Sequence, residues 1–330
     1  MRRNAVICST GACLPQRVLP NAFFDEYLGT NVSSWLENNL QIYQRHWCAE
    51  DESTVDLCEQ AALQALKRAN LQAKDLDLII VATDTPEYLT PATAAVLQDR
   101  LQAGHVGTFD LNAACAGFVM GLDVGAKYIS TDERYNTVLV IGVYVLSKYL
   151  DMSDKKTVTL FGDGAGAVIL TSEEGTNRGF LSSELMTLGQ YFDGMGIYAG
   201  GTKHPITEEE LQFNRHKFSI NYRFPPELNP QVWTRMAKNL FARLDISAED
   251  IQHYILTQLN INSIHKTLDN LKVGHERAHT AMQNYGYTGS ACIPIALNDA
   301  VEKGKIKPDD LILMIGSGSG LTFGSVVFRY

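Results

Sequence analysis

Short, almost wholly hydrophobic runs alternate along this chain with longer stretches in which hydrophobic residues recur at helical spacing. Residues 137–142 and 165–170 are runs of the first kind, and a glycine-rich turn lies between them. Runs of this length predict strands buried on both faces, and the longer stretches predict helices. Strands that alternate with helices are typical of a layered α/β fold.

The same succession of elements occurs twice in the chain. Three pairs of segments match in pattern: residues 73–83 with 248–258, 137–142 with 311–316, and 165–170 with 323–328. In the first pair, an acidic turn enters an aliphatic run each time. A repeat of this length indicates a duplicated domain rather than a solenoid. We therefore expect two similar halves, residues 1–174 and residues 175–330.

Composition limits the function further. The 330 residues contain no apolar run near the roughly 20 residues of a membrane span, so we expect a globular protein without one. The 28 Lys and Arg against 37 Asp and Glu give a net charge of −9, which argues against broad attachment to nucleic acid. The six cysteines lack disulfide or metal-ligand spacing. Such usage indicates reduced thiols in the cytoplasm and no metal site.

One of the six cysteines has the setting of a nucleophile. Cys115 lies among small residues where an extended run gives way to a helical pattern. The first turn of a helix favours a thiolate over a thiol, because the peptide dipole is positive there. Small neighbours let a thioester approach the sulfur closely. The alternative is an inert buried cysteine, which is a common fate of free cysteines.

Duplicated α/β halves with a cysteine at a helix start resemble the thiolase superfamily. The local motifs narrow this to a resemblance to the β-ketoacyl-acyl-carrier-protein synthase III family, over essentially the whole chain. These motifs are the opening at residues 11–19, the Trp35 segment, the Cys115 loop, the turn at 161–167, the segment 285–291 and the closing turn at 316–324. Each motif alone is weak evidence, whereas all of them in this order are strong evidence.

The resemblance implies a thiolase-like fold of two similar halves in a layered α-β-α-β-α arrangement. It also implies that Cys115 accepts an acyl group from coenzyme A, and that a malonyl thioester then loses CO₂ and attacks the bound acyl group. Acyl-coenzyme A, and acyl-carrier protein as a second partner, are then substrates, with no further cofactor. Members of this family are homodimers that serve lipid synthesis, including fatty acid biosynthesis, so we expect the same here.

Two of the three catalytic positions depart from the family pattern. Thr257 stands where the family has a histidine, and Tyr287 stands where it has an asparagine. Those two side chains normally stabilise the enolate that forms as CO₂ leaves. A hydroxyl at each position is still a donor, and the phenol is the better one because its pKa is about 10. Neither hydroxyl is an imidazole base. The predicted site is therefore Cys115, Thr257 and Tyr287.

Acylation of the cysteine depends less on these side chains. The family resemblance assigns the oxyanion donors to the backbone N–H groups of Cys115 and Ser319, and a backbone donor does not depend on its side chain. We therefore expect self-acylation to persist. Loss of one donor in the condensation step typically costs about 10²- to 10³-fold in rate, and replacement by a hydroxyl should cost less.

Four further positions match the family's substrate-binding residues. Thr90 stands in a loop that reaches across the dimer to the partner's acyl site, where the family often has phenylalanine, so longer acyl chains are expected. A neighbour such as Tyr88 refilling that space is the alternative. Trp35 and Lys155 match residues that hold the adenine of coenzyme A, although Trp35 in ordinary packing is an equal alternative. Asn262 replaces an arginine that meets the pantetheine phosphate.

Three classes of function remain open on the sequence. The first is a 3-oxoacyl-synthase acyltransferase that forms a carbon–carbon bond. The second is an acyltransferase that passes the acyl group on Cys115 to an alcohol, amine or thiol without decarboxylation. The third is a non-catalytic partner subunit of a complete ketosynthase. Release of CO₂ distinguishes the first from the second, and an acylable thiol argues against the third.

Overall fold

The structure of the chain, a computed structural model, describes residues 3–330. The strands are β1 (Arg3–Cys13), β2 (Arg17–Pro20), β3 (Gln44–Trp47), β4 (Leu78–Ala82), β5 (Gly107–Leu111), β6 (Thr137–Tyr144), β7 (Gly164–Glu174), β8 (Gly179–Thr187), β9 (Met195–Gly196), β10 (Ser219–Ile220), β11 (His253–Leu256), β12 (Leu311–Gly318) and β13 (Thr322–Arg329). The helices are α1 (Asn21–Leu28), α2 (Ser33–Leu40), α3 (Thr54–Ala69), α4 (Thr93–Leu101), α5 (Gly117–Thr131), α6 (Glu208–Gln212), α7 (Leu228–Leu244), α8 (Ile261–Leu271), α9 (Met282–Tyr285) and α10 (Cys292–Glu302). Two short 3-10 helices matter below, η2 (Ala114–Ala116) and η7 (Gly289–Ala291).

The first sheet has the strand order β1-β7-β6-β4-β5. Its centre is parallel, because β4 pairs in parallel with both β5 and β6, whereas β7 runs antiparallel to β6 and β1. Every residue of β4 and β6 is buried. Continuous apolar runs are typical of strands covered on both faces, so the prediction from the hydrophobic runs is confirmed here.

The second sheet repeats this plan with the order β8-β13-β12-β11. Strands β11 and β12 are parallel, and β13 runs antiparallel to β12 and β8. The three segment pairs found in the sequence therefore lie at equivalent positions, with β4 matching β11, β6 matching β12, and β7 matching β13. All strands of the first sheet end by residue 174, and those of the second start at residue 179. A domain boundary between residues 174 and 175 stays a prediction.

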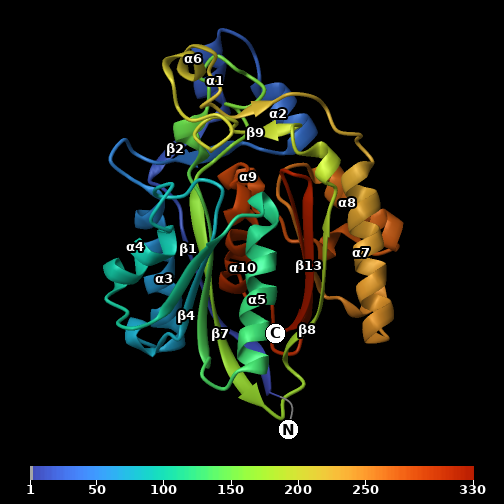
Figure 1. Cartoon of the computed structure of the whole chain (residues 1–330). Coiled ribbons are helices and arrows are strands. Elements are labelled where there is room, and N and C mark those ends of the chain that lie inside the picture. Colours follow the sequence, from blue (N-terminus) through green and yellow to red (C-terminus); the bar gives the residue numbers. More distant parts are fainter. Residues whose placement is uncertain (1–2) are drawn as a thin grey trace.

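Five layers stack across the molecule, as Figure 1 shows. Helices α3 and α4 cover the outer face of the first sheet, and α7 and α8 cover the outer face of the second. Helices α5 and α10 lie between the two sheets and contact both. The expected α-β-α-β-α arrangement of a thiolase-like fold is confirmed.

Local sequence explains how these helices begin and how closely they pack. Helix α3 starts with a capping box, in which Ser53 and Asp56 satisfy each other's free backbone N–H groups. Helix α5 lies tight against the first sheet because Gly121 has no side chain. A Cβ at Gly121 would lie 2.9 Å from Cγ1 of Val140. The central helix can therefore pack close to both sheets, which fixes the position of its first turn.

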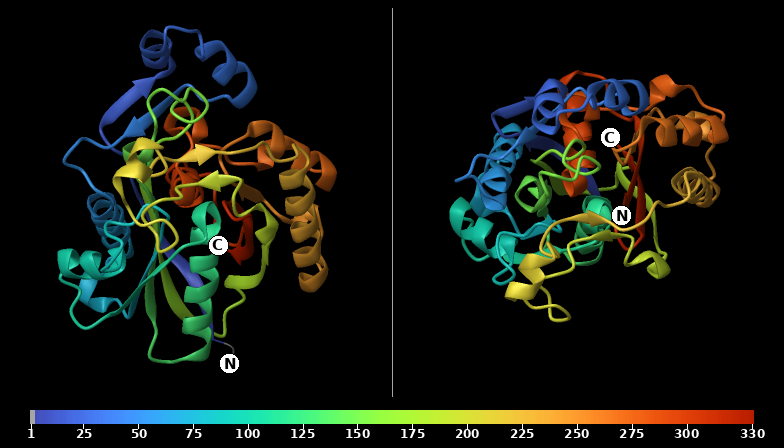
Figure 2. Two further views of the ribbon diagram at one scale, coloured as in Figure 1. Left: turned by 45° about the horizontal axis from the view of Figure 1, so that its top comes forward. Right: turned by 90° about the horizontal axis from the view of Figure 1, so that it is seen from above.

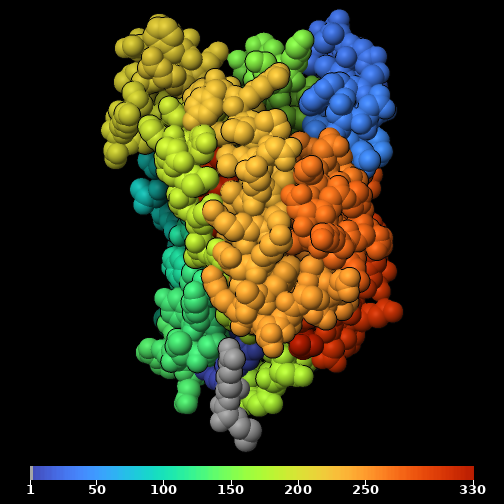
Figure 3. Space-filling model, turned by 90° about the vertical axis from the view of Figure 1, so that its right-hand side faces the viewer, coloured from blue at the N-terminus to red at the C-terminus, as the bar shows by residue number. Residues whose placement is uncertain are grey.

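A cap of loops and short elements covers one end of the layered core (Figures 1 and 2). The cap consists of the segments that carry α1, α2, β2 and β3 on one side and α6, β9 and β10 on the other. Figure 3 shows the segment of α1 and α2 beside α8, and α2 contacts that helix. No helix in the described part of the chain is long and apolar enough to cross a membrane.

Candidate active site

Cys115 lies in the turn that joins β5, the edge strand of the first sheet, to the central helix α5. Strand β5 leads into η2, and α5 continues directly from it. Ala114 has φ 46°, a left-handed conformation that is uncommon for a residue with a side chain. The side-chain oxygen of Asn112 accepts a hydrogen bond of 3.2 Å from the Ala114 N–H and so supports this turn. The sulfur-bearing residue is thus placed at the start of the helix by a tight, strained turn.

The other half of the chain has the same turn. Gly289 also has φ 46°, and η7 leads into α10 as η2 leads into α5. Ser290 therefore occupies the position equivalent to Cys115, and its hydroxyl donates to the Val143 carbonyl oxygen at 2.5 Å. The two turns are the counterparts expected from the duplicated sequence, but only the first carries a thiol.

Each turn packs against the central strand of the opposite half. A Cβ at Gly142 of β6 would lie 2.2 Å from the carbonyl oxygen of Ser290. A Cβ at Gly316 of β12 would lie 3.1 Å from the carbonyl oxygen of Cys115 and 2.7 Å from Cα of Ala116. Both strands carry glycine at this point because any side chain would push the turn away. The Cys115 turn is therefore held by the second half of the chain.

The Cys115 thiol is buried, with 6% of the residue exposed. Burial raises the pKa of Cys115 well above its ordinary value, and the negative charge of Asp84 adds to the rise. The dipole at a helix start stabilises a thiolate by at most about 2 kcal/mol. This is less than the free-energy cost of burying a charged sulfur. The prediction that the helix start makes the thiolate the favoured form is therefore wrong, and attack on a thioester requires the thiol to lose its proton.

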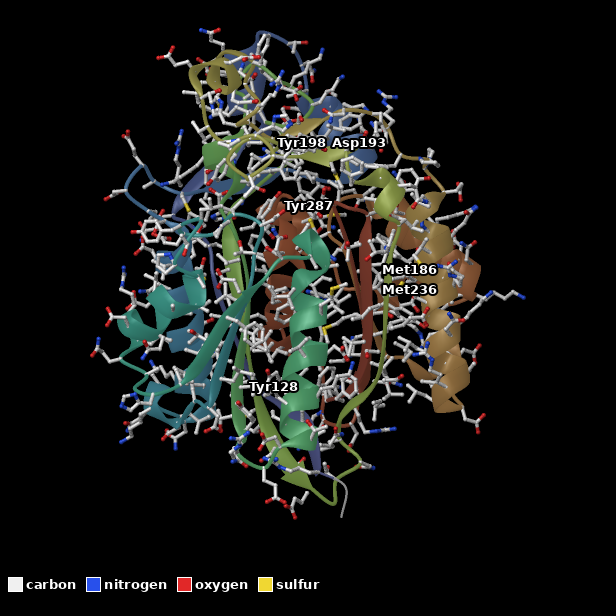
Figure 4. All side chains as sticks on the ribbon, viewed as in Figure 1. Tyr128, Met186, Asp193, Tyr198, Met236 and Tyr287 are labelled. Atoms are coloured by element: carbon white, nitrogen blue, oxygen red, sulfur yellow. The ribbon has the colours of Figure 1, made fainter. Side chains whose placement is uncertain are left out.

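Tyr287 is the closest functional neighbour of the Cys115 sulfur. Its hydroxyl lies within hydrogen-bonding reach of the thiol, and this contact lowers the pKa of Cys115. Burial raises the pKa of Tyr287 well above its ordinary value, so the phenol is a neutral donor. Figure 4 shows Tyr287 near the cap end of α5. The sequence analysis placed both residues in one predicted site, and the structure brings them together.

The backbone of Tyr287 is fixed on both sides. Its N–H donates to the Leu160 carbonyl at 2.9 Å, and its carbonyl accepts from the Gly162 N–H at 3.0 Å. Its ring packs against Phe161, with 5.5 Å between the ring centroids. The glycine-rich segment at 161–167 therefore positions Tyr287, which gives that motif a structural role.

Thr257 directly follows β11 and is 2% exposed. Its hydroxyl oxygen accepts a hydrogen bond of 2.8 Å from the Ser317 N–H. Its other two contacts are long, with Ser317 Oγ at 3.4 Å and the Ser317 carbonyl oxygen at 3.5 Å. The hydroxyl is therefore anchored to β12 through its oxygen, while its proton remains available to a closer acceptor.

Ser319 follows β12 in the closing turn and lies beside Cys115. Its side chain donates to the Met195 carbonyl at 2.5 Å, which orients the turn. Among the hydrogen bonds formed by residues 3–330, none uses the Ser319 backbone N–H. A Cβ at the preceding Gly318 would lie 2.5 Å from the Cys115 nitrogen, so the two backbones meet closely. The geometry suits the predicted oxyanion donors, whose role stays a prediction.

Three cavities lie near these residues. The outer cleft, about 620 Å³, is lined by residues that include Trp35, Lys155 and Lys156. The inner cavity, about 340 Å³, contains Thr257 and Tyr287 in its wall. The outer cleft and the inner cavity share three residues, Ile220, Tyr222 and Arg223. The outer cleft at Trp35 therefore adjoins the cavity that holds Thr257 and Tyr287.

The third space, the side cavity, measures about 310 Å³ and includes Ala113, Ala114 and Ser319 in its wall. It shares only Met195 with the inner cavity. The side cavity thus meets the Cys115 turn itself, whereas the inner cavity meets its neighbours Tyr287 and Gly318. This arrangement suits a nucleophile that carries one group while a second reactant arrives from elsewhere.

Trp35 and Lys155 line the same cleft, as their predicted shared ligand requires. Trp35 projects from α2 and is 55% exposed, so ordinary core packing does not explain it. Arg223 and Lys156 add two further cations to the cleft. Sequence reasoning missed Arg223, because a loop residue after the short strand β10 carries no periodic signal. The cleft has the charge and the aromatic face that a phosphorylated nucleotide requires.

The other two predicted substrate residues lie outside the three cavities. Thr90 is exposed, in a segment where the neighbouring Leu89 is 83% exposed, so it does not close an acyl site of its own subunit. A role in a partner's site stays a prediction. The Asn262 side chain donates to the Asn39 carbonyl at 2.9 Å and joins α8 to α2. Its amide is therefore engaged within the protein rather than directed at a ligand.

Two buried polar groups at the site escaped the sequence analysis. Asp84 follows β4 and lines the side cavity. Trp233 of α7 is 1% exposed and lines the inner cavity, and its indole N–H has no partner among residues 3–330. A carboxylate after a buried strand was visible in the sequence at Asp84, but its neighbours in space were not.

Comparison with solved structures defines the class of protein. The 3-oxoacyl-[acyl-carrier-protein] synthase III of Aquifex aeolicus superposes with a TM-score of 0.88 at 33% identity, covering 99% of this chain and 100% of that one. The corresponding protein of Pseudomonas aeruginosa gives a TM-score of 0.90 at 30% identity, covering 99% and 98%. The fold and the cysteine turn are therefore those of a thiolase-like acyltransferase.

Sequence comparison is more specific. Residues 109–189 match the family model described as 3-oxoacyl-[acyl-carrier-protein (ACP)] synthase III, and residues 241–330 match its C-terminal model. The β-ketoacyl-[acyl-carrier-protein] synthase III of Staphylococcus epidermidis is 34% identical over 327 residues, 99% of each chain. That of Natranaerobius thermophilus is 35% identical over 329 residues, again 99% of each. The chain belongs to the 3-oxoacyl-acyl-carrier-protein synthase III family.

Proposed function

We propose that this member of the family condenses an acyl group, held as a thioester on Cys115, with a malonyl thioester. The observation that carries the proposal is the placement of the Cys115 thiol within reach of the Tyr287 hydroxyl, because Tyr287 lines the inner cavity that adjoins the outer cleft at Trp35. The substrates we propose are acyl-coenzyme A for the first step and malonyl-coenzyme A or malonyl-acyl-carrier protein for the second.

The first step transfers the acyl group to Cys115. The sulfur bonds to the thioester carbonyl carbon, and the carbon–sulfur bond to coenzyme A breaks. The thiol proton passes to the departing coenzyme A sulfur, so that no external base is consumed. Negative charge on the carbonyl oxygen is stabilised by the backbone N–H groups of Cys115 and Ser319. Because the Cys115 thiol has a raised pKa, these donors and the close leaving group determine the rate.

The second step breaks the bond between the malonyl carboxylate and the neighbouring carbon. CO₂ leaves, and charge moves onto the thioester oxygen of the resulting enolate. A neutral donor stabilises this oxygen, and the buried phenol of Tyr287 remains protonated because its pKa is raised. The Thr257 hydroxyl is the second donor. The enolate carbon then attacks the carbonyl carbon of the Cys115 thioester and forms the new carbon–carbon bond. The bond to sulfur breaks, Cys115 leaves as a thiolate, and it then takes a proton from solvent.

The outer cleft supports coenzyme A as the acyl carrier. The exposed Trp35 ring offers a face for the adenine, and a cation over an indole contributes about 0.5–2 kcal/mol. Lys155, Lys156 and Arg223 are three cations suited to the phosphates. Arg223, at the junction with the inner cavity, compensates for the absence of an arginine at Asn262.

We also propose that the protein acts in the cytoplasm as a homodimer. The segment before Thr90 exposes Tyr88 and Leu89 by 55% and 83%, and an exposed apolar tip of this kind suits contact with a second subunit. Light scattering coupled to size exclusion tests the assembly. A Leu89→Asp variant should then shift the mass towards that of one chain.

Mass spectrometry of the intact protein tests the function. Wild type should gain one acyl mass from acyl-coenzyme A, and Cys115→Ala should not. The matched variant Cys292→Ala, at another buried cysteine, should still gain it. Adding a malonyl thioester should then remove the acyl mass and release CO₂ with a β-ketoacyl product. No acyl gain at any chain length would contradict the proposal and favour a non-catalytic subunit.

A second candidate is acyl transfer without decarboxylation. It is favoured by one observation, that Thr257 and Tyr287 replace the histidine and the asparagine of the family pattern, so that neither position carries an imidazole. In this case a malonyl thioester would leave the acyl-enzyme intact. An alcohol, amine or thiol acceptor would discharge it without release of CO₂.

A further inference from the structure

Asp84 brings a carboxyl group into the side cavity beside the Cys115 turn. It stands two residues after β4, at the carboxyl end of a central parallel strand. The side cavity is lined by Asp84 together with Ala113 and Ala114, which immediately precede the nucleophile. The negative charge of Asp84 is close enough to act on the Cys115 thiol. The condensation mechanism above gives this carboxyl group no task.

The carboxyl group is poorly satisfied by the protein. Its Oδ1 atom is buried and has no hydrogen-bond partner among residues 3–330. Burial raises the pKa of Asp84 to about 6, so the group carries a negative charge at neutral pH. The nearby hydroxyls of Thr83 and Thr85 do not donate to Asp84: they contact each other at 3.3 Å, and each accepts from a backbone N–H. A buried carboxylate without a full set of donors is unfavourable for folding.

The remaining wall of the side cavity offers no positive charge. Its residues include the apolar side chains of Leu146, Ile197 and Phe218, and none of its lining residues is a lysine, arginine or histidine. The terminal torsion of an aspartate is soft, so the carboxylate can turn to a donor that enters the space. The polar side chains of Asn112, Tyr198, Ser319 and Thr322 also line the cavity, but Asp84 is its one charged lining residue, and its Oδ1 lacks a partner within residues 3–330.

The position of the side cavity indicates what enters it. Coenzyme A and its pantetheine arm reach the site through the outer cleft and the inner cavity, which share Ile220, Tyr222 and Arg223. The side cavity shares none of these residues and meets the Cys115 turn from another wall. A group already bonded to the sulfur fits this space, since the arm occupies the other.

We propose that the acyl group on Cys115 lies in the side cavity and that Asp84 selects acyl groups which carry a hydrogen-bond donor, either a hydroxyl or a protonated amine. This inference rests on the proposed function and specifies its substrate class. A donor on the acyl chain supplies the partner that Asp84 lacks. An unsubstituted chain of the same length leaves the carboxylate unsatisfied.

The expected preference follows from the strength of such bonds. A hydrogen bond to a charged buried group favours the donor-bearing chain by about tenfold to a hundredfold. The difference should appear in kcat/KM for acylation of Cys115 by each acyl-coenzyme A. A protonated amine should exceed a hydroxyl, because it adds a charge to the hydrogen bond.

Competition between matched acyl donors tests the proposal. Wild type is given equal butyryl- and 3-hydroxybutyryl-coenzyme A, then butyryl- and 3-aminobutyryl-coenzyme A, and each adduct on Cys115 is counted by intact mass. Hexanoyl-coenzyme A against its hydroxy and amino derivatives extends the comparison to a longer chain. The same competitions are run with Asp84→Asn and with Asp84→Ala.

Glu87→Gln is the matched control. The Glu87 carboxylate lies three residues along the same segment and accepts from the Val55 N–H at 2.9 Å, and it does not line the side cavity. We expect wild type and Glu87→Gln to prefer at least one donor-bearing chain. Asp84→Asn and Asp84→Ala should lose most of that preference, measured as the ratio of the two adducts within each competition. A melting curve for each variant shows whether it is folded.

The outcomes separate the inference from the function on which it rests. If wild type is acylated by all chains at equal rates, the selectivity of Asp84 is refuted and the acyltransfer function stands. If Asp84→Asn slows every donor alike, Asp84 has a role in the chemistry instead of in selection, and the inference is again wrong. If no donor acylates wild type, the proposed function and the inference both fail.

Discussion

Replacement of Tyr287 by phenylalanine separates the two half-reactions. The substitution removes one hydroxyl and keeps the ring that packs against Phe161 at 5.5 Å between centroids. The backbone bonds to Leu160 and Gly162 do not involve the side chain and should persist. The change in folding stability should therefore be limited to one hydrogen bond, about 0.5–1.5 kcal/mol.

The two steps should respond very differently. Condensation loses the donor that faces the enolate oxygen, which typically lowers the rate by about 10²- to 10³-fold. Acylation relies on backbone donors, so its rate should stay within about threefold of wild type. The site then holds an acyl group that malonyl thioester discharges only slowly.

The thiol itself provides an independent readout. The Tyr287 hydrogen bond lowers the pKa of Cys115 in opposition to burial. Its removal should therefore raise the pKa of that thiol. At a fixed pH, less thiolate is present in the variant, so alkylation of Cys115 by iodoacetamide should be slower and its pH midpoint should be higher.

Single-turnover mass spectrometry measures both steps in one sample. The acyl adduct is followed first, and its loss after addition of malonyl thioester is followed second. Tyr285→Phe is the control, because its hydroxyl contacts Asp299 at 3.4 Å and the residue lines none of the three cavities. An equal loss in both steps, or an unchanged condensation rate, would refute the role given to Tyr287.

Three further outcomes are expected. Gly316→Ala and Gly142→Ala should each destabilise the fold by about 1–3 kcal/mol through overpacking, seen as a lower melting temperature, but only the first should impair acylation. An equal loss of acylation in the two glycine variants would contradict this expectation. Trp35→Ala should raise KM for acyl-coenzyme A by about 2- to 30-fold at constant kcat, and a fall in kcat alone would argue against a binding role. Asp84→Asn should increase stability at pH 7.5: the carboxyl pKa of about 6 against an ordinary 3.8 corresponds to about 3 kcal/mol. The Asp84 carboxyl group is protonated in both the folded and the unfolded state below pH 3.8, so the cost is absent there, and it is complete above pH 6. The stability gained by Asp84→Asn, measured by denaturation, should therefore vanish near pH 4.

The sequence was sufficient for the repeated architecture because its signal is local. The runs at residues 137–142 and 311–316 form strands wherever they are covered on both faces, and duplication placed them at equivalent sites in the two sheets. The Cys115 turn was likewise predictable, since small residues and a strand-to-helix transition are adjacent in the chain.

The rest of the site depends on contacts between distant segments. Burial of Cys115 is set by both halves together, so the helix start alone predicted the wrong direction for its pKa. The neighbours of Asp84 and the position of Arg223 at a junction of two cavities arise only when the loops fold over the core. The bond from Asn262 to Asn39 likewise joins two segments far apart in sequence.

The exchange of turns between the halves has an evolutionary consequence. Each turn rests on a glycine of the opposite half, so neither half can drift in backbone geometry without disturbing the other. Position 290 needs only a small donor for the Val143 carbonyl, whereas position 115 carries the thiol to which the proposed function assigns the chemistry. Under that proposal, one copy of the turn serves the reaction and the other is its structural counterpart.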